Sequence, residues 1–167
     1  GGYVYTGSIG NELLLGKINS DGQEEWIRKI NFRDNTNGVD VNNTSDGGYI
    51  VTGNSSFNDR RYVYLVKTDS EGNGQWERYL DLQLGEENAG NSVQQTNDDG
   101  YIVVGTSYNF SSFDSYIFLI KLNSYGETDW EKTMGGGNFY GSNSVLQTTD
   151  DGFLVTGRVP FEPTSNC

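Results

Sequence analysis

The segment GYIVTG at residues 48–53 decides how the rest of the chain is interpreted, because close copies of it recur. The copies are GYVYTG at 2–7, GYIVVG at 100–105 and GFLVTG at 152–157. The two later copies each start 52 residues after the one before, and the earliest starts 46 residues before GYIVTG. Self-similarity at a fixed period of this length indicates a repeat architecture.

A second group of landmarks follows the same period. Each set consists of a Lys, a Gly in a turn and a Trp, in that order: Lys17, Gly22 and Trp26; Lys67, Gly72 and Trp76; Lys121, Gly126 and Trp130. Corresponding members are 50 and then 54 residues apart. Landmarks that recur in the same order in three copies establish a repeat of about 50 residues.

Each repeat divides into four short β-like runs. In the best-defined copy they cover residues 90–97, 100–107, 115–123 and 128–134, separated by clusters of Asn, Asp and Gly. Strands of this length bounded by such turns predict antiparallel β structure, and no window has the apolar 3.6-residue period of a helix. Four strands in about 50 residues is the pattern of a β-propeller blade. We therefore predict an all-β propeller built of four-stranded antiparallel blades.

The ends of the chain fall inside predicted blades. The second strands of the blades are expected at 2–8, 48–55, 100–107 and 152–158, within a propeller region of residues 1–160. The whole chain then holds thirteen strands, about three and a quarter blades, whereas closed propellers need at least four. The sequence is thus expected to be a fragment of a larger propeller or to be closed by oligomerisation. Residues 161–167, which include the single Cys167, are a tail or the start of the next blade.

The repeat resembles a known group of propellers. The pattern D-G-G-Y-I-V-x-G, then K-x-[DN]-S-x-G, W-x-[KR] and G-x-S-V-x-Q-T, is carried most closely by residues 46–53, 67–76 and 90–96. It is similar to propeller repeats of secreted and cell-surface proteins of bacteria and archaea, and its strand order is similar to that of kelch repeats. The resemblance implies an extracellular or cell-surface propeller, usually within a longer protein. It implies no particular activity, since propellers carry many functions.

Composition excludes several classes of function. The chain has no His, which removes Ser-His-Asp triads and His-built metal sites. Its net charge of -12 has the wrong sign for binding nucleic acid or anionic membranes. No apolar run is long enough for a membrane helix, so we expect no membrane insertion. One Cys cannot form a disulfide framework.

Candidate binding residues are those that break the repeat, because recurring positions are expected to serve the scaffold. The three Trp and the recurring Asp46, Asp98 and Asp150 are interpreted as structural. In a propeller, the loops 54–61 and 107–114 emerge on the same face as the loops that connect successive blades. Aromatic side chains in these loops suit the C–H faces of sugar rings. They are Phe57, Tyr108, Phe110, Phe113, Phe139 and Tyr140. The alternative is that these rings fold back onto the blade rims.

Other chemistries have weaker signals. Asp81, Glu86 and Glu87 share one loop and would act as acid and base at glycosidase spacing. The turns at 19–22 and 69–73 resemble calcium loops but lack their full ligand spacing, so calcium is a weak possibility and a plain Asx-Gly hairpin the better interpretation. Asn54 and Asn109 are glycosylation candidates in the loops.

The sequence therefore predicts a non-enzymatic extracellular module for binding or adhesion, with a glycan or protein ligand and no cofactor. Two alternatives stay open. One is part of a glycan-active propeller enzyme, and the other is a structural subunit of a glycosylated surface assembly or filament. Further partners would be other copies of the chain or the missing blades.

Overall fold

The computed structural model describes residues 1–30, 35–137 and 141–158. In this part of the chain the protein is all-β, with 69% of the residues in strands and no helix, which confirms the all-β part of the prediction. The strands are β1 (Gly2–Ile9), β2 (Glu12–Asn19), β3 (Glu24–Ile30), β4 (Thr36–Asn43), β5 (Tyr49–Phe57), β6 (Arg60–Thr68), β7 (Gly74–Leu80), β8 (Glu87–Gln95), β9 (Tyr101–Tyr108), β10 (Ser115–Leu122), β11 (Thr128–Gly137), β12 (Gly141–Gln147) and β13 (Phe153–Arg158).

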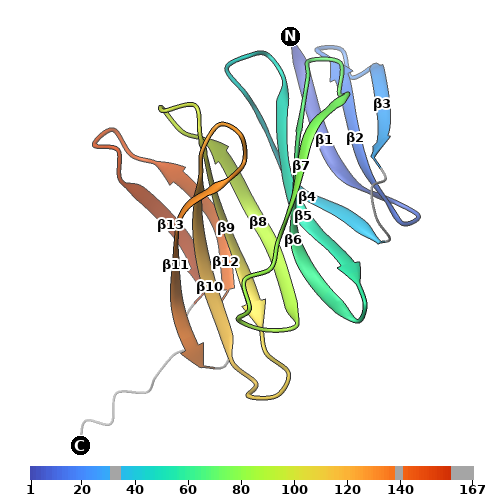
Figure 1. The fold of residues 1–167 in the computed structure, drawn as a ribbon. Coiled ribbons are helices and arrows are strands. Elements are labelled where there is room, and N and C mark those ends of the chain that lie inside the picture. Colours follow the sequence, from blue (N-terminus) through green and yellow to red (C-terminus); the bar gives the residue numbers. More distant parts are fainter. Residues whose placement is uncertain (31–34, 138–140, 159–167) are drawn as a thin grey trace, which may run out of the picture.

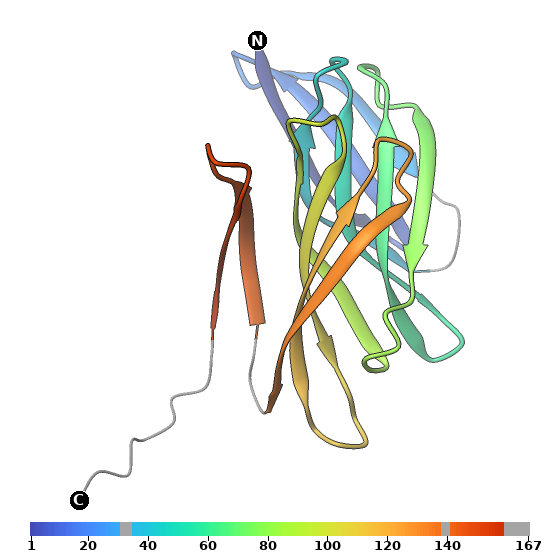
Figure 2. The same cartoon turned by 60° about the vertical axis from the view of Figure 1, so that its left-hand side comes forward.

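The strands form four antiparallel units that follow the sequence repeat. Unit 1 is β1–β2–β3, unit 2 is β4–β5–β6–β7, unit 3 is β8–β9–β10–β11 and unit 4 is the hairpin β12–β13. Within each unit, strands adjacent in sequence pair with one another, so only short turns connect them. A single parallel bridge between Arg61 and Glu87 links units 2 and 3. Figures 1 and 2 show the units lying side by side as successive layers.

The turn that leads into the last strand is the same in units 1, 2 and 3. Asn19, Asp69 and Asn123 each accept hydrogen bonds from the backbone N–H groups two and four residues ahead. The glycine three residues further on has a φ between 76° and 79°, a left-handed conformation that favours glycine. The Asx and Gly positions of the repeat thus close each hairpin locally.

The core consists of three apolar clusters, each between two consecutive units. The cluster between units 2 and 3 contains Ile50, Val63 and Leu65 from one side and Val103 and Phe118 from the other. Equivalent clusters join units 1 and 2 and units 3 and 4. The central strands are continuously apolar because alternate side chains point to opposite faces, and each interior unit has a neighbour on both faces.

The Trp residues pack across the junctions between units, as predicted. The ring centroids of Trp26 and Tyr49 lie 5.8 Å apart, and the same pair recurs as Trp76 with Tyr101 at 5.5 Å and Trp130 with Phe153 at 5.8 Å. Each Trp lies on the last strand of one unit, and its partner begins the second strand of the next unit. The repeat of about 50 residues therefore places the same Trp–aromatic contact at each junction between units.

The two end units each present one exposed face. Tyr3 is 69% exposed, whereas Tyr49 and Tyr101, at the same position of units 2 and 3, are buried. Leu154 is 52% exposed, whereas the equivalent Ile50 and Ile102 are completely buried. Tyr3 is the same residue as its buried equivalents, and Leu154 is aliphatic like its own. Both are exposed because no neighbouring unit packs on them among the described residues.

Candidate functional site

Three segments meet at one end of the strands, the lower end in Figure 1. They are the tips of the hairpins β5–β6 and β9–β10 and the connection from β7 to β8, residues 54–61, 107–114 and 81–87. We call this surface the hairpin face. The sequence analysis predicted that these loops emerge on the same face, and the contacts described below join them.

The connection between β7 and β8 is held first by the β5–β6 hairpin. Arg60 contacts the carboxylate of Asp81 at 3.5 Å and donates to the carbonyl of Gly85 at 3.3 Å. The Arg61 N–H donates to the Glu86 carbonyl at 2.8 Å, and its guanidinium pairs with Glu87 at 2.7 Å. Two adjacent arginines thus fix both ends of the connection.

The β9–β10 hairpin holds the same connection from the other side. The Phe110 N–H donates to Glu86 Oε2 at 2.9 Å, and Asn109 Nδ2 donates to the Leu84 carbonyl at 3.4 Å. The carboxylates of Asp81, Glu86 and Glu87 therefore all have partners within the hairpin face. Each of the three carboxylates thus takes part in a contact that holds the loops together.

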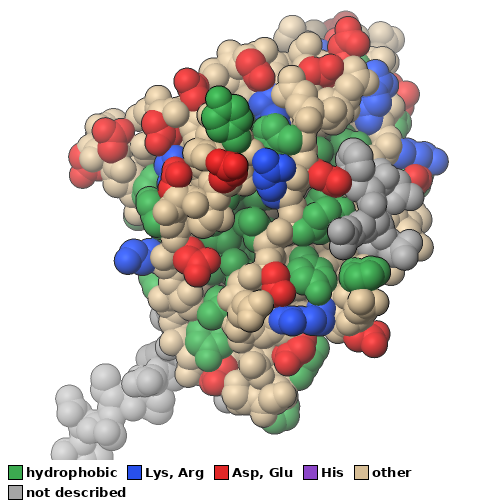
Figure 3. Space-filling view, in the orientation of Figure 1, with side chains coloured by type: hydrophobic (Ala, Val, Ile, Leu, Met, Phe, Trp, Pro, Cys, Tyr) green, Lys and Arg blue, Asp and Glu red, His purple; other side chains and the backbone are tan. Residues whose placement is uncertain are grey.

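The predicted aromatic residues of the hairpin face fall into two groups. Phe57, Phe110 and Phe113 are between 43% and 62% exposed. Tyr108 packs edge-on against Phe110, with ring centroids 5.3 Å apart, so this pair partly folds back onto the rim. Figure 3 shows hydrophobic side chains reaching the surface at this lower end of the molecule. Phe139 and Tyr140 lie outside the described residues, as do Cys167 and the tail.

Phe57 forms one wall of a small aromatic pocket. The pocket has a volume of about 190 Å³ and is lined by Phe57, Tyr62, Tyr79 and Ser55. Tyr62 lies opposite Ser55 in the pairing of β6 with β5, while Tyr79 comes from β7. We call this site the aromatic pocket.

Sequence reasoning found Phe57 but missed Tyr62 and Tyr79. A signal was present at two of the three positions, because the repeat places Asn109 where Phe57 stands and Thr133 where Tyr79 stands. Tyr62, in contrast, corresponds to Tyr116, which also pairs with a Ser. The pocket is therefore specific to unit 2, although part of its wall belongs to the repeat.

The wall at Tyr79 is rigid. Its ring centroid lies 5.0 Å from that of the fully buried Tyr64, and the hydroxyls of both residues donate to Glu77 Oε2. Burial, with a smaller contribution from the nearby charge of Glu77, raises the pKa of Tyr64 well above its ordinary value. The pocket is thus backed by a packed and hydrogen-bonded layer.

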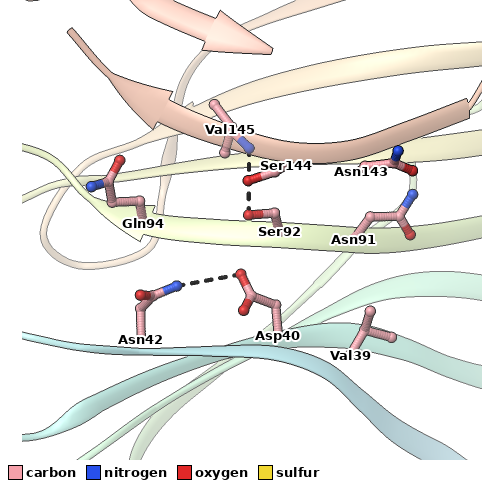
Figure 4. Close-up of a pocket in the computed structure, with 9 residues that line it drawn as sticks. All are labelled: Val39, Asp40, Asn42, Asn91, Ser92, Gln94, Asn143, Ser144 and Val145. Carbon is pink, nitrogen blue, oxygen red and sulfur yellow. Dashed lines mark hydrogen bonds between the residues drawn. The ribbon is translucent and has the colours of Figure 1, made fainter. Parts of the chain in front are cut away.

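A second hollow runs across the inner strands β4, β8 and β12 and has a volume of about 290 Å³. Figure 4 shows its polar lining, in which Asp40 faces Asn42 and Ser92 faces β12. Asp40 Oδ2 accepts from the Val93 N–H at 2.9 Å, and Asn42 Nδ2 donates to the Val93 carbonyl at 2.8 Å. These side chains join neighbouring units, so the polar lining serves the scaffold.

The proposed calcium turns use their oxygens internally. Asp69 Oδ1 accepts from the N–H groups of Glu71 and Asn73, and its other oxygen accepts from Asn73 Nδ2. These hydrogen bonds lower the pKa of Asp69. Among residues 1–30, 35–137 and 141–158, no group of three or more His, Cys, Asp or Glu is arranged to hold a metal ion. The turns have the geometry of Asx-Gly hairpins.

The two glycosylation candidates differ in their surroundings. Asn54 was predicted to lie in a loop, but it lies within β5, opposite Val63, and is half-buried, because the β5–β6 pairing extends to Phe57. Asn109 caps its own loop, because Oδ1 accepts from the N–H groups of Ser111 and Ser112 at 2.9 and 3.0 Å. Its amide nitrogen is directed to Leu84, so both ends of the side chain have protein partners.

Comparison with known proteins was made for the whole chain. No family model matches it, and no curated protein matches it. In the part of the chain that the structure describes, no helix is long and apolar enough to span a membrane.

Proposed function

We propose that the four units are blades of a β-propeller of the type found in secreted and cell-surface proteins of bacteria and archaea. Three observations support this proposal: four strands in each complete repeat, packing of each unit face against the next, and a Trp at every junction. The exposed faces at Tyr3 and Leu154 are then the surfaces on which further blades would pack. An extracellular or cell-surface location goes with this type of repeat.

The protein acts, in this proposal, as a non-enzymatic module for binding or adhesion. The observation that carries it is the aromatic pocket, in which Phe57, Tyr62 and Tyr79 surround a hollow at positions that partly break the repeat. Phe57 and Tyr79 stand where the next unit has Asn109 and Thr133, so the packing of the repeat does not require these two rings. The loop carboxylates that an enzyme would use are engaged in holding the hairpin face together.

The chemistry of the pocket favours one ring-sized group of a glycan. Its volume of about 190 Å³ lies below the roughly 300–1,000 Å³ of most small-molecule sites, so it accepts a single unit and not an extended ligand. Aromatic faces pack against the C–H faces of a sugar. The net charge of -12 disfavours anionic glycans.

A second candidate function is a structural subunit of a surface assembly. The specific observation in its favour is the pair of exposed end faces, where Tyr3 and Leu154 present side chains that are buried in the interior units. In this case stacking of copies, and not ligand binding, would be the main role of the chain.

A glycan array tests the binding function. We expect the protein to bind a neutral glycan and the Phe57→Ala variant to lose most of that binding. Tyr125→Ala is the matched control, because Tyr125 is an exposed aromatic residue in a turn at the opposite end of the strands. Equal binding by the parent and Phe57→Ala would refute the site. No binding by the parent, together with concentration-dependent oligomers in light scattering, would favour the assembly role.

A further inference from the structure

A set of pockets recurs at the junctions between units, at the end of the strands opposite the hairpin face. The pocket between units 2 and 3 has a volume of about 290 Å³ and is lined by residues that include Asp46, Lys67, Trp76, Gln95, Asp99 and Tyr101. The pocket between units 3 and 4 has the same six positions, occupied by Asp98, Lys121, Trp130, Gln147, Asp151 and Phe153. We call the first of these the junction pocket.

The junction pocket is an open hollow whose lining residues all belong to the interior units 2 and 3. Ser124, in the turn that follows β10, forms part of its rim. The corresponding pocket between units 3 and 4 is larger, at about 490 Å³, and no such turn contributes to its lining. The junction pocket therefore does not result from an exposed end unit.

Hydrogen bonds hold its walls in place. The buried Lys67 ammonium contacts both oxygens of Asp46, the Thr68 carbonyl and Gln75 Oε1, all within 3.1 Å. Gln95 Oε1 accepts from the Ser45 N–H at 2.7 Å, which leaves the amide Nε2 as a donor. The positive charge of Lys67 and the negative charge of Asp46 neutralise each other. Asp99 therefore supplies the remaining net negative charge of the lining.

One hydroxyl in this pocket has no hydrogen-bond partner in the protein. Tyr101 is only 3% exposed, and its ring packs edge-on against Trp76. Within residues 1–30, 35–137 and 141–158, no group forms a hydrogen bond with its hydroxyl. The hydroxyl oxygen is not one of the fully buried unpartnered atoms, so it is open to a water molecule or a ligand in the pocket.

The same feature occurs one unit earlier. Tyr49 is 6% exposed, lines a pocket of about 240 Å³ between units 1 and 2, and likewise has no hydrogen-bond partner for its hydroxyl in the described chain. The hydroxyl is absent one unit later, where Phe153 stands. The scaffold therefore accepts either residue, which indicates that packing alone does not require the hydroxyl.

We propose that the junction pocket binds one neutral sugar unit through Tyr101, Asp99 and Gln95. The three groups differ in their hydrogen-bonding roles: the Asp99 carboxylate only accepts, Gln95 Nε2 only donates, and the Tyr101 hydroxyl can donate or accept. Sugar hydroxyls match all three. An ammonium ion has no acceptor atom to which Gln95 Nε2 could donate. A phosphate has no hydrogen to donate to Asp99, and its negative charge is repelled by that carboxylate.

The state of the Tyr101 hydroxyl agrees with this assignment. Burial, together with the charges of Asp46 and Asp99, raises the pKa of Tyr101 to about 12. The hydroxyl is therefore protonated at neutral pH and available as a donor to a sugar oxygen. This site is independent of the aromatic pocket, because the two lie at opposite ends of the strands.

Titration of the ¹⁵N-labelled protein with glucose, galactose, mannose and N-acetylglucosamine, followed by NMR, tests the proposal. We expect at least one of these sugars to shift the signals of the Gln95 side-chain amide and the Trp76 indole N–H. Loss of one hydrogen bond in Tyr101→Phe should raise the Kd about three- to tenfold. Tyr3→Phe, at the equivalent but exposed position, and Phe57→Ala, in the aromatic pocket, should leave this Kd unchanged.

A second variant distinguishes loss of sugar binding from loss of folding. Ser124→Phe places a ring at the rim of the junction pocket, on an exposed turn, and should abolish the shifts while the melting temperature is kept. The proposal is overturned if none of the four sugars shifts these signals, or if Tyr101→Phe binds with the parent Kd. Tighter binding of tetramethylammonium than of any sugar would also overturn it. Loss of glycan binding in Phe57→Ala on the array, with these shifts intact, would show that the two sites are separate.

Discussion

The buried ammonium of Lys67 lies 2.8 Å from Asp46 Oδ2, at the turn that joins β4 to β5. The same pair recurs in the next unit, where Lys121 Nζ lies 2.9 Å from Asp98 Oδ2. In each pair the lysine is buried, while the carboxylate remains half-exposed. A buried charge requires a partner, so these aspartates compensate the lysines of the repeat.

The first prediction concerns this compensation. Asp46→Ala should lower the free energy of unfolding by about 2–3 kcal/mol, because it leaves Lys67 buried with only neutral acceptors. Urea denaturation measures the change. Asp21→Ala is the control, since Asp21 lies in an exposed turn and has no ion pair in the described chain. Equal losses in the two variants would contradict the role of the pair.

The second prediction concerns acid. Hydrogen bonds from Lys67 and Thr44 lower the pKa of Asp46 from 3.8 to about 2, and hydrogen bonds from Thr96 and Lys121 do the same for Asp98. Because the pKa is depressed in the folded state, this stabilisation is present above the unfolded pKa and is lost as the pH falls through the folded one. Stability should therefore fall between about pH 4 and about pH 2.

A double variant identifies the groups responsible. Asp46→Asn with Asp98→Asn should be less stable than the parent at pH 6 and should lose less stability between pH 5 and pH 2. Melting temperatures across this range provide the measurement. A parent protein whose melting temperature is constant down to pH 2 would refute the argument.

The third prediction separates packing from surface aromatics. Trp76→Ala should cost about 3–5 kcal/mol, because Trp76 fills the junction between units 2 and 3 and contacts Tyr101. Phe110→Ala should cost less than about 1 kcal/mol, since its ring lies on the exposed hairpin tip. If both variants lose the same stability in denaturant unfolding, Phe110 is a core residue and not a surface one.

The fourth prediction uses two glycines with the same backbone conformation. Gly22 and Gly126 both have a φ near 80° in equivalent turns, but an added Cβ meets nothing at Gly22 and lies 2.9 Å from the Trp76 ring at Gly126. Gly22→Ala should cost about 1–2 kcal/mol from backbone strain alone. Gly126→Ala should cost at least about 1 kcal/mol more. Equal costs would show that the turn does not press on Trp76.

Much of the fold follows from the sequence by itself. The repeat of Gly, Lys and Trp landmarks predicted four strands per unit and thirteen strands in total, and the described residues form thirteen. This succeeds because strand alternation and turn chemistry act over a few residues. The packing of Trp76 against the next unit was also predictable, since a period repeated three times implies a contact repeated at each junction.

The tertiary structure decided which side chains meet. Tyr62 and Tyr79 join Phe57 only through the register of β6 with β5 and β7, which the sequence pattern does not specify. Likewise, the Glu86 carboxylate accepts a hydrogen bond from the Phe110 N–H, because packing of the units brings the β9–β10 hairpin next to it.

The unpartnered hydroxyl of Tyr101 shows the same division. Its place in the repeat predicted burial, as for Tyr49, but whether a donor or acceptor lies within reach depends on side chains from two separate units. Local patterns determine where the chain is extended and where it turns. The partners of a buried polar group are set by long-range packing, and these partners distinguish a binding site from a piece of scaffold.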